Sequence, residues 1–221
     1  MARHIVIVGG GAAGTLTAIH IARASREPTQ ATIIERRVVL GEGIAYGTAD
    51  SAHLLNVPAS GMSAHGDDPT HFVRWAGCAP GDFVARSRYA EYLRAELTAA
   101  QAASPHFAVR HLRASAERIA VTVTVATKAT TTPHRVATSD GQSIDADAVV
   151  LALGNAAPTR PLWVSNFSAC PVVVDPWAAG ALDAIDSRAK VLCVGTGLTF
   201  VDIALSLARR GARVTGVSRH G

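Results

Sequence analysis

A short apolar run opens the chain and stops at a cluster of glycines. Residues 4–8 read His-Ile-Val-Ile-Val, and the segment from Gly9 to Gly14 follows them directly. An alanine-rich helical pattern continues from about Ala12 to Ser25, and a second apolar run extends from Ala31 to Glu35. Strand, glycine turn, helix and strand, in this order, predict the opening βαβ unit of a doubly wound α/β fold.

Two further helices are predicted in the first half of the chain. Asp68-Pro69 has the composition of a helix start, with Asp68 as the N-cap and Pro69 at the first helical position. The residues expected to face inward from this helix are Phe72, Val73 and Ala76. A second helix is expected from about Ser87, and the residues on its apolar face are Tyr89, Tyr92, Leu93 and Leu97. Ahead of both helices, residues 38–67 form a long apolar, glycine-rich stretch, which favours a folded binding loop.

Alternating and continuous apolar patterns indicate further strands. Residues 106–113 have a weak strand pattern, and an alternation of valine with threonine follows it, which is typical of a half-buried strand. The valines of this alternation are Val121, Val123 and Val125. Short strand patterns around an Asp140-Gly141 turn complete a small β-meander inserted in the parallel sheet. The apolar residues 148–153 then predict a buried parallel strand, which ends at Gly154-Asn155.

The opening pattern recurs near the carboxyl end. Residues 156–188 contain four prolines and lack periodicity, so we expect a linker with a short helix near 181–185. Residues 190–194 and 213–217 are apolar runs, and a glycine turn at 195–200 leads into a helix between them. The residues expected on the inner face of this helix are Val201, Ala204, Leu205 and Ala208. Because one βαβ unit cannot complete a doubly wound domain, we expect an amino-terminal fragment of a longer protein.

The first glycine turn carries the chemistry of a dinucleotide site. Gly9, Gly11 and Gly14 fit G-x-G-x-x-G. In this motif the first glycine allows the tight turn, the second leaves room for a pyrophosphate, and the third lets helix and strand approach closely. The helix N-terminus favours negative charge, and Glu35 stands where a carboxylate can accept hydrogen bonds from a ribose diol. The surrounding strand, helix and acid favour a binding site over a chance glycine turn.

Composition and charge narrow the classes of partner. The 221 residues are 48% hydrophobic and 17% charged, which indicates a globular protein. The net charge is +4, but the arginines are scattered, so we expect a polyanionic cofactor and a small-molecule substrate rather than nucleic acid. No apolar run approaches the ~20 residues of a membrane helix, and we expect no membrane partner.

Cysteines and histidines suggest no further centre. Three cysteines, odd in number and far apart, indicate structural thiols in a reducing cytoplasm and disfavour disulfide reductase chemistry. Histidines and aspartates gather in the first third of the chain, and their spacing matches no compact ligand set. We therefore expect solvated loop residues and no metal site. The residues concerned are His53, His65, Asp67, Asp68 and His71.

Four longer motifs carry a resemblance to a particular protein family. They are Gly43-Ile-Ala-Tyr-Gly47, His53-Leu-Leu-Asn-Val-Pro-Ala59, Leu151-Ala-Leu-Gly-Asn155 and Gly195-Thr-Gly-Leu-Thr199 followed by Val201-Asp202. Together with the two glycine fingerprints, they resemble the bacterial FAD/NAD(P)-binding protein family. Members of this family are largely uncharacterised flavin oxidoreductases, distantly related to the flavin monooxygenases. The resemblance covers nearly the whole chain, and residues 53–59 are its most specific part.

The resemblance implies roles for particular residues. The first glycine turn would bind the FAD pyrophosphate, and Glu35 would bind the adenosine ribose. Asn56 and Val57 would lie near the flavin ring, and the turn at Gly154 would close over the cofactor. The second fingerprint would bind NADPH or NADH.

The second fingerprint departs from the family pattern at two places. Phe200 stands where a small residue is usual, and a bulky side chain there should push the helix away from the strand, so NAD(P) binding is less secure than FAD binding. Ser218 and Arg219 follow the second strand in place of an acid. A hydroxyl and a guanidinium suit a 2′-phosphate, which favours NADP over NAD, although a solvated basic end is the alternative.

We therefore expect an α/β fold in which a Rossmann-like FAD-binding domain, with a parallel sheet and an inserted β-meander, precedes the start of a Rossmann NAD(P)-binding domain. The expected boundaries are 1–155 for the FAD-binding domain, 156–188 for a linker, and 189–221 for the start of the NAD(P)-binding domain.

The expected function is an FAD-dependent oxidoreductase with NAD(P)H as hydride donor, monooxygenases included. A non-catalytic flavin-binding protein, acting as a redox sensor or scaffold, and a flavoprotein acting on RNA remain alternatives. No catalytic residue is assigned. The candidate cofactor-binding residues are Gly9, Gly11, Ala12, Ala13, Gly14, Glu35, Arg36, Asn56, Val57, Gly154, Gly195, Gly197, Thr199 and Arg219.

Overall fold

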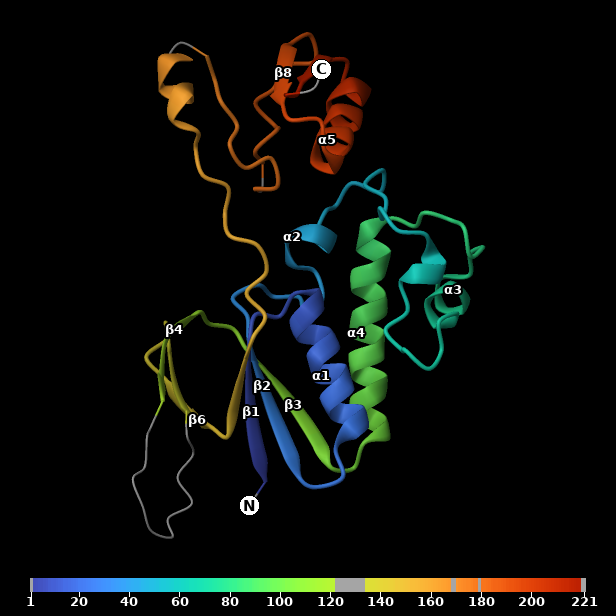
Figure 1. The fold of residues 1–221 in the computed structure, drawn as a ribbon, viewed down its shortest axis with the longest axis vertical. Coiled ribbons are helices and arrows are strands. Elements are labelled where there is room, and N and C mark those ends of the chain that lie inside the picture. Colours follow the sequence, from blue (N-terminus) through green and yellow to red (C-terminus); the bar gives the residue numbers. More distant parts are fainter. Residues whose placement is uncertain (1, 122–133, 168–169, 179, 220–221) are drawn as a thin grey trace.

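The chain begins with the predicted βαβ unit (Figure 1). The computed structural model describes residues 2–121, 134–167, 170–178 and 180–219. The elements of the unit are β1 (Arg3–Val8), α1 (Ala12–Ala24) and β2 (Thr29–Ile34). β1 and β2 pair in parallel along their whole length, which confirms the prediction.

A four-stranded parallel sheet, in the order β3-β2-β1-β7, forms the centre of the first part of the chain. β3 (Phe107–Leu112) pairs with β2, and β7 (Ala148–Leu151) pairs with β1. β7 is shorter than the predicted strand and is not buried, since Leu151 is 60% exposed. The predicted burial was wrong because, among the described residues, β7 has a paired neighbour on one side only.

Successive residues of the central strands are buried on opposite faces of the sheet. Ile7 and Ile33 belong to a core that also contains residues of α1 and α4. Val8 and Ile34 belong to a second core, which they share with β5 and β6. Since neighbouring side chains of a strand point to opposite faces, a sheet covered on both sides needs strands that are apolar throughout. The continuous apolar runs of β1 and β2 therefore follow from their central position.

Helices α1 and α4 lie side by side on one face of the sheet (Figure 1). α4 (Arg86–Ala103) buries the predicted face, which consists of Tyr89, Tyr92, Leu93 and Leu97. The short helix α3 (His71–Ala76) packs on α4 through Phe72, whose ring centroid lies 5.5 Å from that of Tyr89 and 5.0 Å from that of Tyr92. Aromatic packing thus fixes α3, and the loop that leads to it, against α4.

The predicted helix start at Asp68-Pro69 was wrong. α3 begins at His71, and its N-cap is Thr70. The Asp68 carboxylate instead pairs with the guanidinium of Arg74, with Oδ2 and Nη2 2.5 Å apart. This hydrogen-bonded partner lowers the pKa of the Asp68 carboxyl to about 2. A carboxylate held by an arginine one turn into the helix does not cap the helix.

A three-stranded antiparallel sheet covers part of the opposite face (Figure 1). Its strands are β4 (Ala116–Val121), β5 (His134–Thr138) and β6 (Ser143–Ala146). The Asp140-Gly141 turn joins β5 to β6, which confirms the predicted meander. Val121 is 62% exposed instead of half-buried, because β4 lies at the edge of this sheet. Val123 and Val125 lie outside the described residues.

A second βαβ unit follows near the carboxyl end, as predicted. It consists of β8 (Lys190–Val194), α5 (Leu198–Arg209) and β9 (Arg213–Val217). The two strands pair in parallel, and α5 packs on them through Ile203 and Leu207. Val201 and Leu205, which were predicted to face inward, are exposed. That prediction was wrong because the adjacent stripe of α5 contacts Val191 and Val214 of the strands, and Asp202 and Ser206 are the other buried residues of the helix.

The short helix predicted near 181–185 does not form in the described residues 180–185. The segment makes consecutive turns, with the N–H of Ala181 donating to Ala178 and that of Asp183 donating to Gly180. Leu182 and Ile185 pack against α5, so tertiary contacts replace a helical face. The remaining helical turns of the described chain are α2 (Gly43–Tyr46), η1 (Ala59–Gly61) and η2 (Leu162–Phe167).

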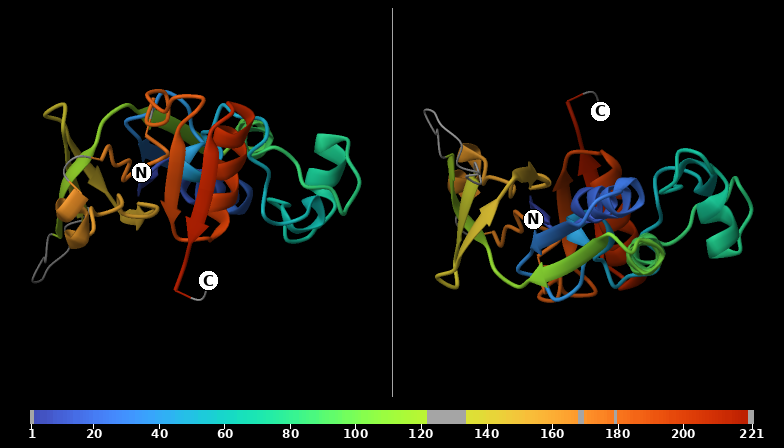
Figure 2. Two further views of the ribbon diagram at one scale, coloured as in Figure 1. Left: turned by 90° about the horizontal axis from the view of Figure 1, so that it is seen from above. Right: turned by 90° about the horizontal axis from the view of Figure 1, so that it is seen from below.

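The second βαβ unit lies beyond the end of the central sheet at which β1 and β2 finish (Figures 1 and 2). Residues 152–189 connect it to β7. The expected domain boundaries within this connection stay predictions. Among the described residues, no helix is both long enough and apolar enough to cross a membrane.

Candidate functional site

The first glycine turn closes tightly between β1 and α1. Gly9 has a φ of +103°, and a Cβ atom there would lie 2.2 Å from the carbonyl oxygen of Ala152. A Cβ atom on Gly14 would lie 1.9 Å from the carbonyl oxygen of Gly9. Both positions therefore require glycine, and α1 begins in direct contact with the end of β1.

The N-terminus of α1 opens at the same turn. Its N-cap is Gly11, which has no side chain to bind the helix, and Thr15 N–H donates to the Gly11 oxygen at 3.0 Å. The N–H groups of Ala12, Ala13 and Gly14 precede this first helical bond and have no carbonyl of their own helix to bind. Together with the helix dipole, they make a site for an anion such as a pyrophosphate.

Glu35 lies beside the glycine turn at the end of β2. Its Oε2 accepts the N–H of Gly10 at 3.0 Å, and its Oε1 accepts the N–H of Arg37 at 2.9 Å. These bonds fix the carboxylate, while each oxygen keeps a further lone pair for another donor. The sequence interpretation missed the Gly10 N–H, the group that ties the acid to the turn.

The glycine-rich loop after Glu35 packs on the same turn. Gly41 N–H donates to the Gly10 oxygen at 2.8 Å, and a Cβ atom on Gly11 would meet the Gly43 Cα at 3.4 Å. The predicted folded loop is thus part of the site. A hollow of about 490 Å³ opens along it, and its lining residues are Val38, Val39, Leu40, Glu42, Arg94, Leu97, Thr98 and His111.

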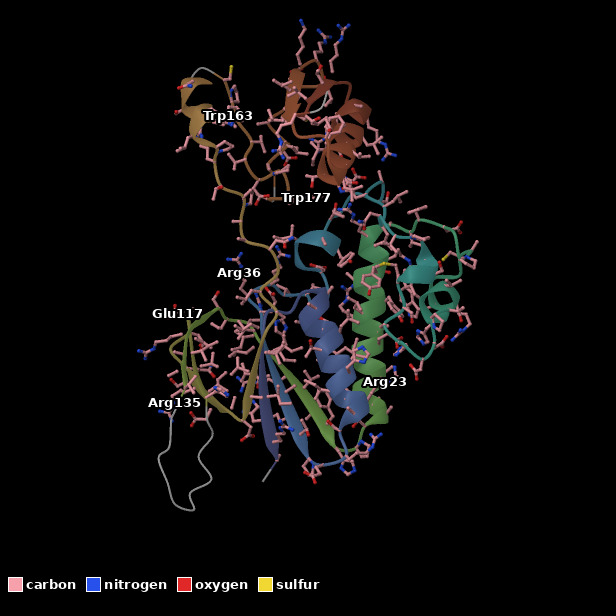
Figure 3. All side chains as sticks on the ribbon, in the orientation of Figure 1. Arg23, Arg36, Glu117, Arg135, Trp163 and Trp177 are labelled. Carbon is pink, nitrogen blue, oxygen red and sulfur yellow. The ribbon has the colours of Figure 1, made fainter. Side chains whose placement is uncertain are left out.

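Four other predicted residues lie on exposed segments. Arg36 follows Glu35 directly and is exposed (Figure 3). Asn56 and Val57 are exposed in the turn before η1. Gly154 follows β7 and has a φ of +68°. Their contact with a cofactor stays a prediction.

The second glycine turn repeats the geometry of the first. Gly195 has a φ of +105° and donates its N–H to Val217 at 2.8 Å, as Gly9 donates to Ile34 at 2.9 Å. Gly197 is the N-cap of α5 and has the same extended conformation as Gly11. Thr199 lies exposed in the first turn of α5. The N-terminus of α5 therefore has the same open backbone geometry as that of α1, and its binding of an anion stays a prediction.

Phe200 does not separate α5 from the strands, so that expectation was wrong. Its ring lies over Gly216 of β9, where a Cβ atom would be 2.8 Å from the Phe200 Cζ. The missing side chain at Gly216 makes room for the bulky one. Gly216 was the sequence signal for this compensation, and the motif alone does not include it. Arg219, which completes the predicted nucleotide site, is exposed two residues after β9.

Polar side chains of the loop before η1 and of α4 contact α5 of the second βαβ unit. His53 Nε2 lies 2.8 Å from Ser206 Oγ, which donates to Asp50 Oδ2 at 2.7 Å. Arg86, the first residue of α4, pairs with the buried Asp202 of α5, with Nη2 and Oδ2 2.7 Å apart. His53, at the start of the most family-specific motif, is therefore a buried contact residue and not a solvated one.

The remaining histidines of the predicted solvated group are also engaged. His65 and His71 lie next to each other, with ring centroids 4.4 Å apart, and both face Glu96 of α4. Glu96 was missed because it lies 25 residues beyond His71 in the chain. The signal available was its position four residues after Tyr92, on the same face of the predicted helix.

Comparison with known proteins agrees with this geometry. Residues 6–156 match the protein family described as FAD-NAD(P)-binding. The chain belongs to this family. The matched part of this FAD-NAD(P)-binding protein contains the first glycine turn, Glu35 and the central sheet except for the first three residues of β1. No curated protein sequence matches the chain.

Solved structures with similar folds include several monooxygenases. A double mutant of a flavin monooxygenase from Stenotrophomonas maltophilia has a TM-score of 0.60 at 18% identity. The FAD-bound cadaverine monooxygenase of desferrioxamine biosynthesis from Erwinia amylovora has a TM-score of 0.61 at 12% identity. A cyclohexanone monooxygenase mutant from Rhodococcus sp. Phi1, bound to NADP+, has a TM-score of 0.59 at 16% identity.

The matches cover 97–99% of this FAD-NAD(P)-binding protein but 58%, 52% and 38% of these three chains, respectively. At such identities the likeness shows the fold, which confirms the expected α/β architecture.

Proposed function

We propose that the protein is an FAD-dependent oxidoreductase that takes a hydride from NADPH or NADH, with monooxygenation as the reaction class its fold favours. The observation that carries this proposal is the convergence of three features at one point. The Gly9–Gly14 turn, the open N-terminus of α1 and the fixed carboxylate of Glu35 all meet at the end of β1 and β2.

The residues of this point fit the pyrophosphate and adenosine parts of FAD. Gly11, the N-cap of α1, has no side chain that could cover the first N–H groups of the helix. The pyrophosphate would accept hydrogen bonds from the first N–H groups of α1. The Glu35 oxygens would accept from the ribose hydroxyls through the lone pairs that Gly10 and Arg37 leave.

FAD supplies the redox chemistry when it is bound, accepting a hydride and passing electrons to a substrate or to oxygen. The chain's part is to bind and orient. The first helix N-terminus holds the pyrophosphate, and Glu35 fixes the adenosine end. Asn56, Val57 and the Gly154 turn are the segments proposed to shield the reactive end from water. The substrate is proposed to be a small molecule.

The second unit is proposed to bind the nicotinamide dinucleotide. Its turn has the backbone geometry of the first, and the Phe200–Gly216 contact preserves the packing of α5 on β9. Arg219, two residues after β9, is proposed to pair with a 2′-phosphate, so that NADPH is preferred over NADH.

Anaerobic reduction of the flavin tests the function. The purified chain, loaded with FAD, is mixed with NADPH without oxygen, and the flavin absorbance is followed. Bleaching within the mixing experiment supports an oxidoreductase. The proposed function would be overturned if calorimetry shows no NADPH binding and NADPH does not bleach the flavin, while dithionite still reduces it. The protein would then be a non-catalytic flavin-binding protein.

A further inference from the structure

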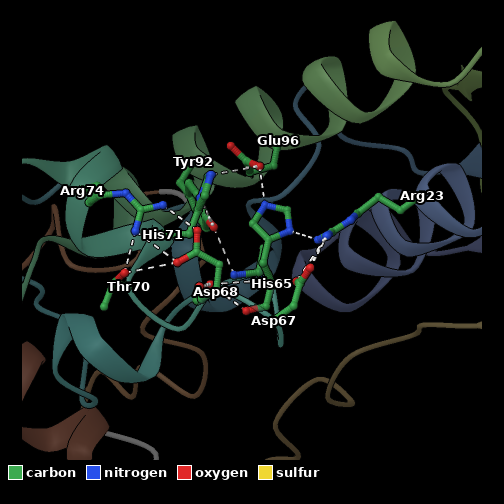
Figure 4. Close-up of polar contacts among 11 residues, drawn as sticks. Arg23, His65, Asp67, Asp68, Thr70, His71, Arg74, Tyr92 and Glu96 are labelled. Carbon is green, nitrogen blue, oxygen red and sulfur yellow. Dashed lines mark hydrogen bonds and ion pairs between the residues drawn. The ribbon is translucent and has the colours of Figure 1, made fainter.

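His65, in the loop before α3, and His71, the first residue of α3, face one carboxylate of α4 (Figure 4). His65 Nε2 lies 2.6 Å from Glu96 Oε2, and His71 Nε2 lies 4.0 Å from the same oxygen. One donor atom from each of the three residues lies within 4.8 Å of the other two. The side chains of His65 and Glu96 are each 11% exposed, so the cluster is shielded, while His71, 28% exposed, leaves one side accessible.

His71 is oriented as a ligand. Its Nδ1 lies 2.9 Å from the hydroxyl oxygen of Tyr92, which also accepts the N–H of Ala64 at 3.1 Å. Metal binding at Nε2 uses the tautomer of His71 with its proton on Nδ1, in which Nδ1–H donates to this oxygen and Nε2 keeps a lone pair. A lone pair that faces a carboxylate oxygen has no attraction to it until a cation lies between them.

His65 has partners at both ring nitrogens. Arg23, which can only donate, contacts Nδ1, so Nε2 carries the ring proton and donates it to Glu96. Arg23 also pairs with Asp67, with Nη2 and Oδ2 2.9 Å apart. A cation at Nε2 displaces that proton, and the ring takes a proton at Nδ1 instead. Nδ1 then needs an acceptor, which Asp67 is and Arg23 is not.

We propose that His65, His71 and Glu96 bind one divalent transition-metal ion of the zinc class. Two imidazoles and one carboxylate are a ligand set that Zn²⁺ accepts, with a water molecule in the fourth position. Zn–N and Zn–O bonds of about 2.0–2.2 Å place tetrahedral ligand atoms roughly 3.4 Å apart. The two distances to Glu96 Oε2 therefore each change by less than about 1 Å, one lengthening and one shortening, which side-chain rotation supplies.

The bound ion fastens the loop before α3 to α4 and raises the stability of the folded state. Arg23 competes with it for His65. The site shares no residue with the glycine turn or Glu35, so the inference does not depend on the proposed flavin chemistry.

Metal titration of the chelator-treated protein tests this inference. Co²⁺ is followed by its visible absorption and Zn²⁺ by calorimetry, with the thermal midpoint measured in parallel. We expect one equivalent of either ion to bind and the midpoint to rise. His71→Gln should weaken metal binding more than about 10-fold. Removing a residue that only hydrogen-bonds to a metal ligand already weakens binding about 10-fold, and His71 is proposed as a ligand itself. Arg23→Gln should strengthen binding, which a merely structural role of the cluster does not predict.

His20, exposed on α1, provides the matched control, and His20→Gln should bind both ions like the unchanged protein. The thermal midpoint of metal-free His71→Gln shows that this variant is folded. The inference is overturned if the unchanged protein binds no stoichiometric metal, or if His71→Gln binds it with unchanged affinity.

Discussion

The imidazole of His53, in the loop before η1, lies 2.8 Å from the hydroxyl of Ser206 of α5, although 153 residues separate the two along the chain. Since Ser206 donates to Asp50, its oxygen accepts from His53 Nε2–H, and His53 Nδ1 accepts from Thr48 at 2.6 Å. Each group thus donates to the next along the series Thr48, His53, Ser206 and Asp50. Nearly complete burial of His53 and Ser206 makes these bonds costly to break.

Ser206→Ala should loosen the contact between α5 and the loop that contains Asp50 and His53. It leaves the His53 Nε2–H buried without an acceptor, which costs about 1–3 kcal/mol in the free energy of unfolding. The Ser206 hydrogen bond is the main cause that lowers the pKa of Asp50 below its ordinary 3.8, so the variant should raise that pKa. Urea unfolding and an NMR titration of the Asp50 carboxyl measure the two effects.

The pH dependence of the contact has a definite sign. Because the pKa of Asp50 is lowered in the folded state, its stabilising contribution is present above pH 3.8 and is lost as the pH falls through the lowered value. Ser206→Ala should reduce this dependence, while the N–H of Ala52 and the charge of Arg209 continue to lower the pKa of Asp50. Ser60, exposed in η1, is the control, and Ser60→Ala should change neither quantity. An unchanged Asp50 pKa in Ser206→Ala would contradict the assigned hydrogen-bond direction.

Gly216→Ala should destabilise the second unit, because its Cβ would lie 2.8 Å from the ring of Phe200. Overpacking of this kind costs roughly 1–3 kcal/mol. Adding Phe200→Ala should recover part of the loss, and a double-mutant cycle of unfolding free energies measures the coupling. Gly81→Ala is the control, since a Cβ there meets no atom within 4 Å. If the two substitutions change the free energy of unfolding additively, the proposed packing of Phe200 on Gly216 is wrong.

Arg219→Glu should invert the dinucleotide preference. A carboxylate repels the 2′-phosphate of NADPH and can accept from the ribose hydroxyls of NADH. We expect NADPH affinity to fall about 10-fold or more, the effect of losing a charge-assisted pair of about 1.5–3 kcal/mol, while NADH affinity is kept. Calorimetry with both dinucleotides checks this. Arg213→Glu, at the opposite end of β9, is the control. Equal effects of the two variants would sink the assignment.

Local patterns predicted the elements that depend on neighbouring residues. The glycine turns and their flanking strands were foreseen because the backbone geometry at Gly9 and Gly195 is encoded within a few residues. The family resemblance supplied FAD, which the turn alone does not distinguish from NAD. The face of α4 was foreseen because its apolar residues recur at helical spacing.

Long-range pairing explains most of what was missed. Asp68 does not cap α3 because Arg74 holds it. The inner face of α5 was misplaced because Asp202 and Ser206 are buried by partners more than 100 residues away, at Arg86 and Asp50. No periodicity argument locates such partners. The same holds for the meeting of His65 and His71 with Glu96.

The central claim is that the first glycine turn and Glu35 bind FAD, and the effect of Glu35→Gln on FAD affinity tests it most directly. FAD is titrated into the cofactor-free chain, and the dissociation constant is compared with that of Glu35→Gln, while circular dichroism and the thermal midpoint confirm folding. Glu117→Gln, an exposed change on β4, serves as the matched control (Figure 3). A glutamine keeps one acceptor but loses the charge, which is worth about 1.5–3 kcal/mol in hydrogen bonds to a charged group.

We therefore expect one FAD per chain, an affinity about 10- to 100-fold weaker in folded Glu35→Gln, and no change in Glu117→Gln. A chain that is folded but binds no FAD, or a folded Glu35→Gln that binds FAD as tightly as the unchanged protein, would contradict the account.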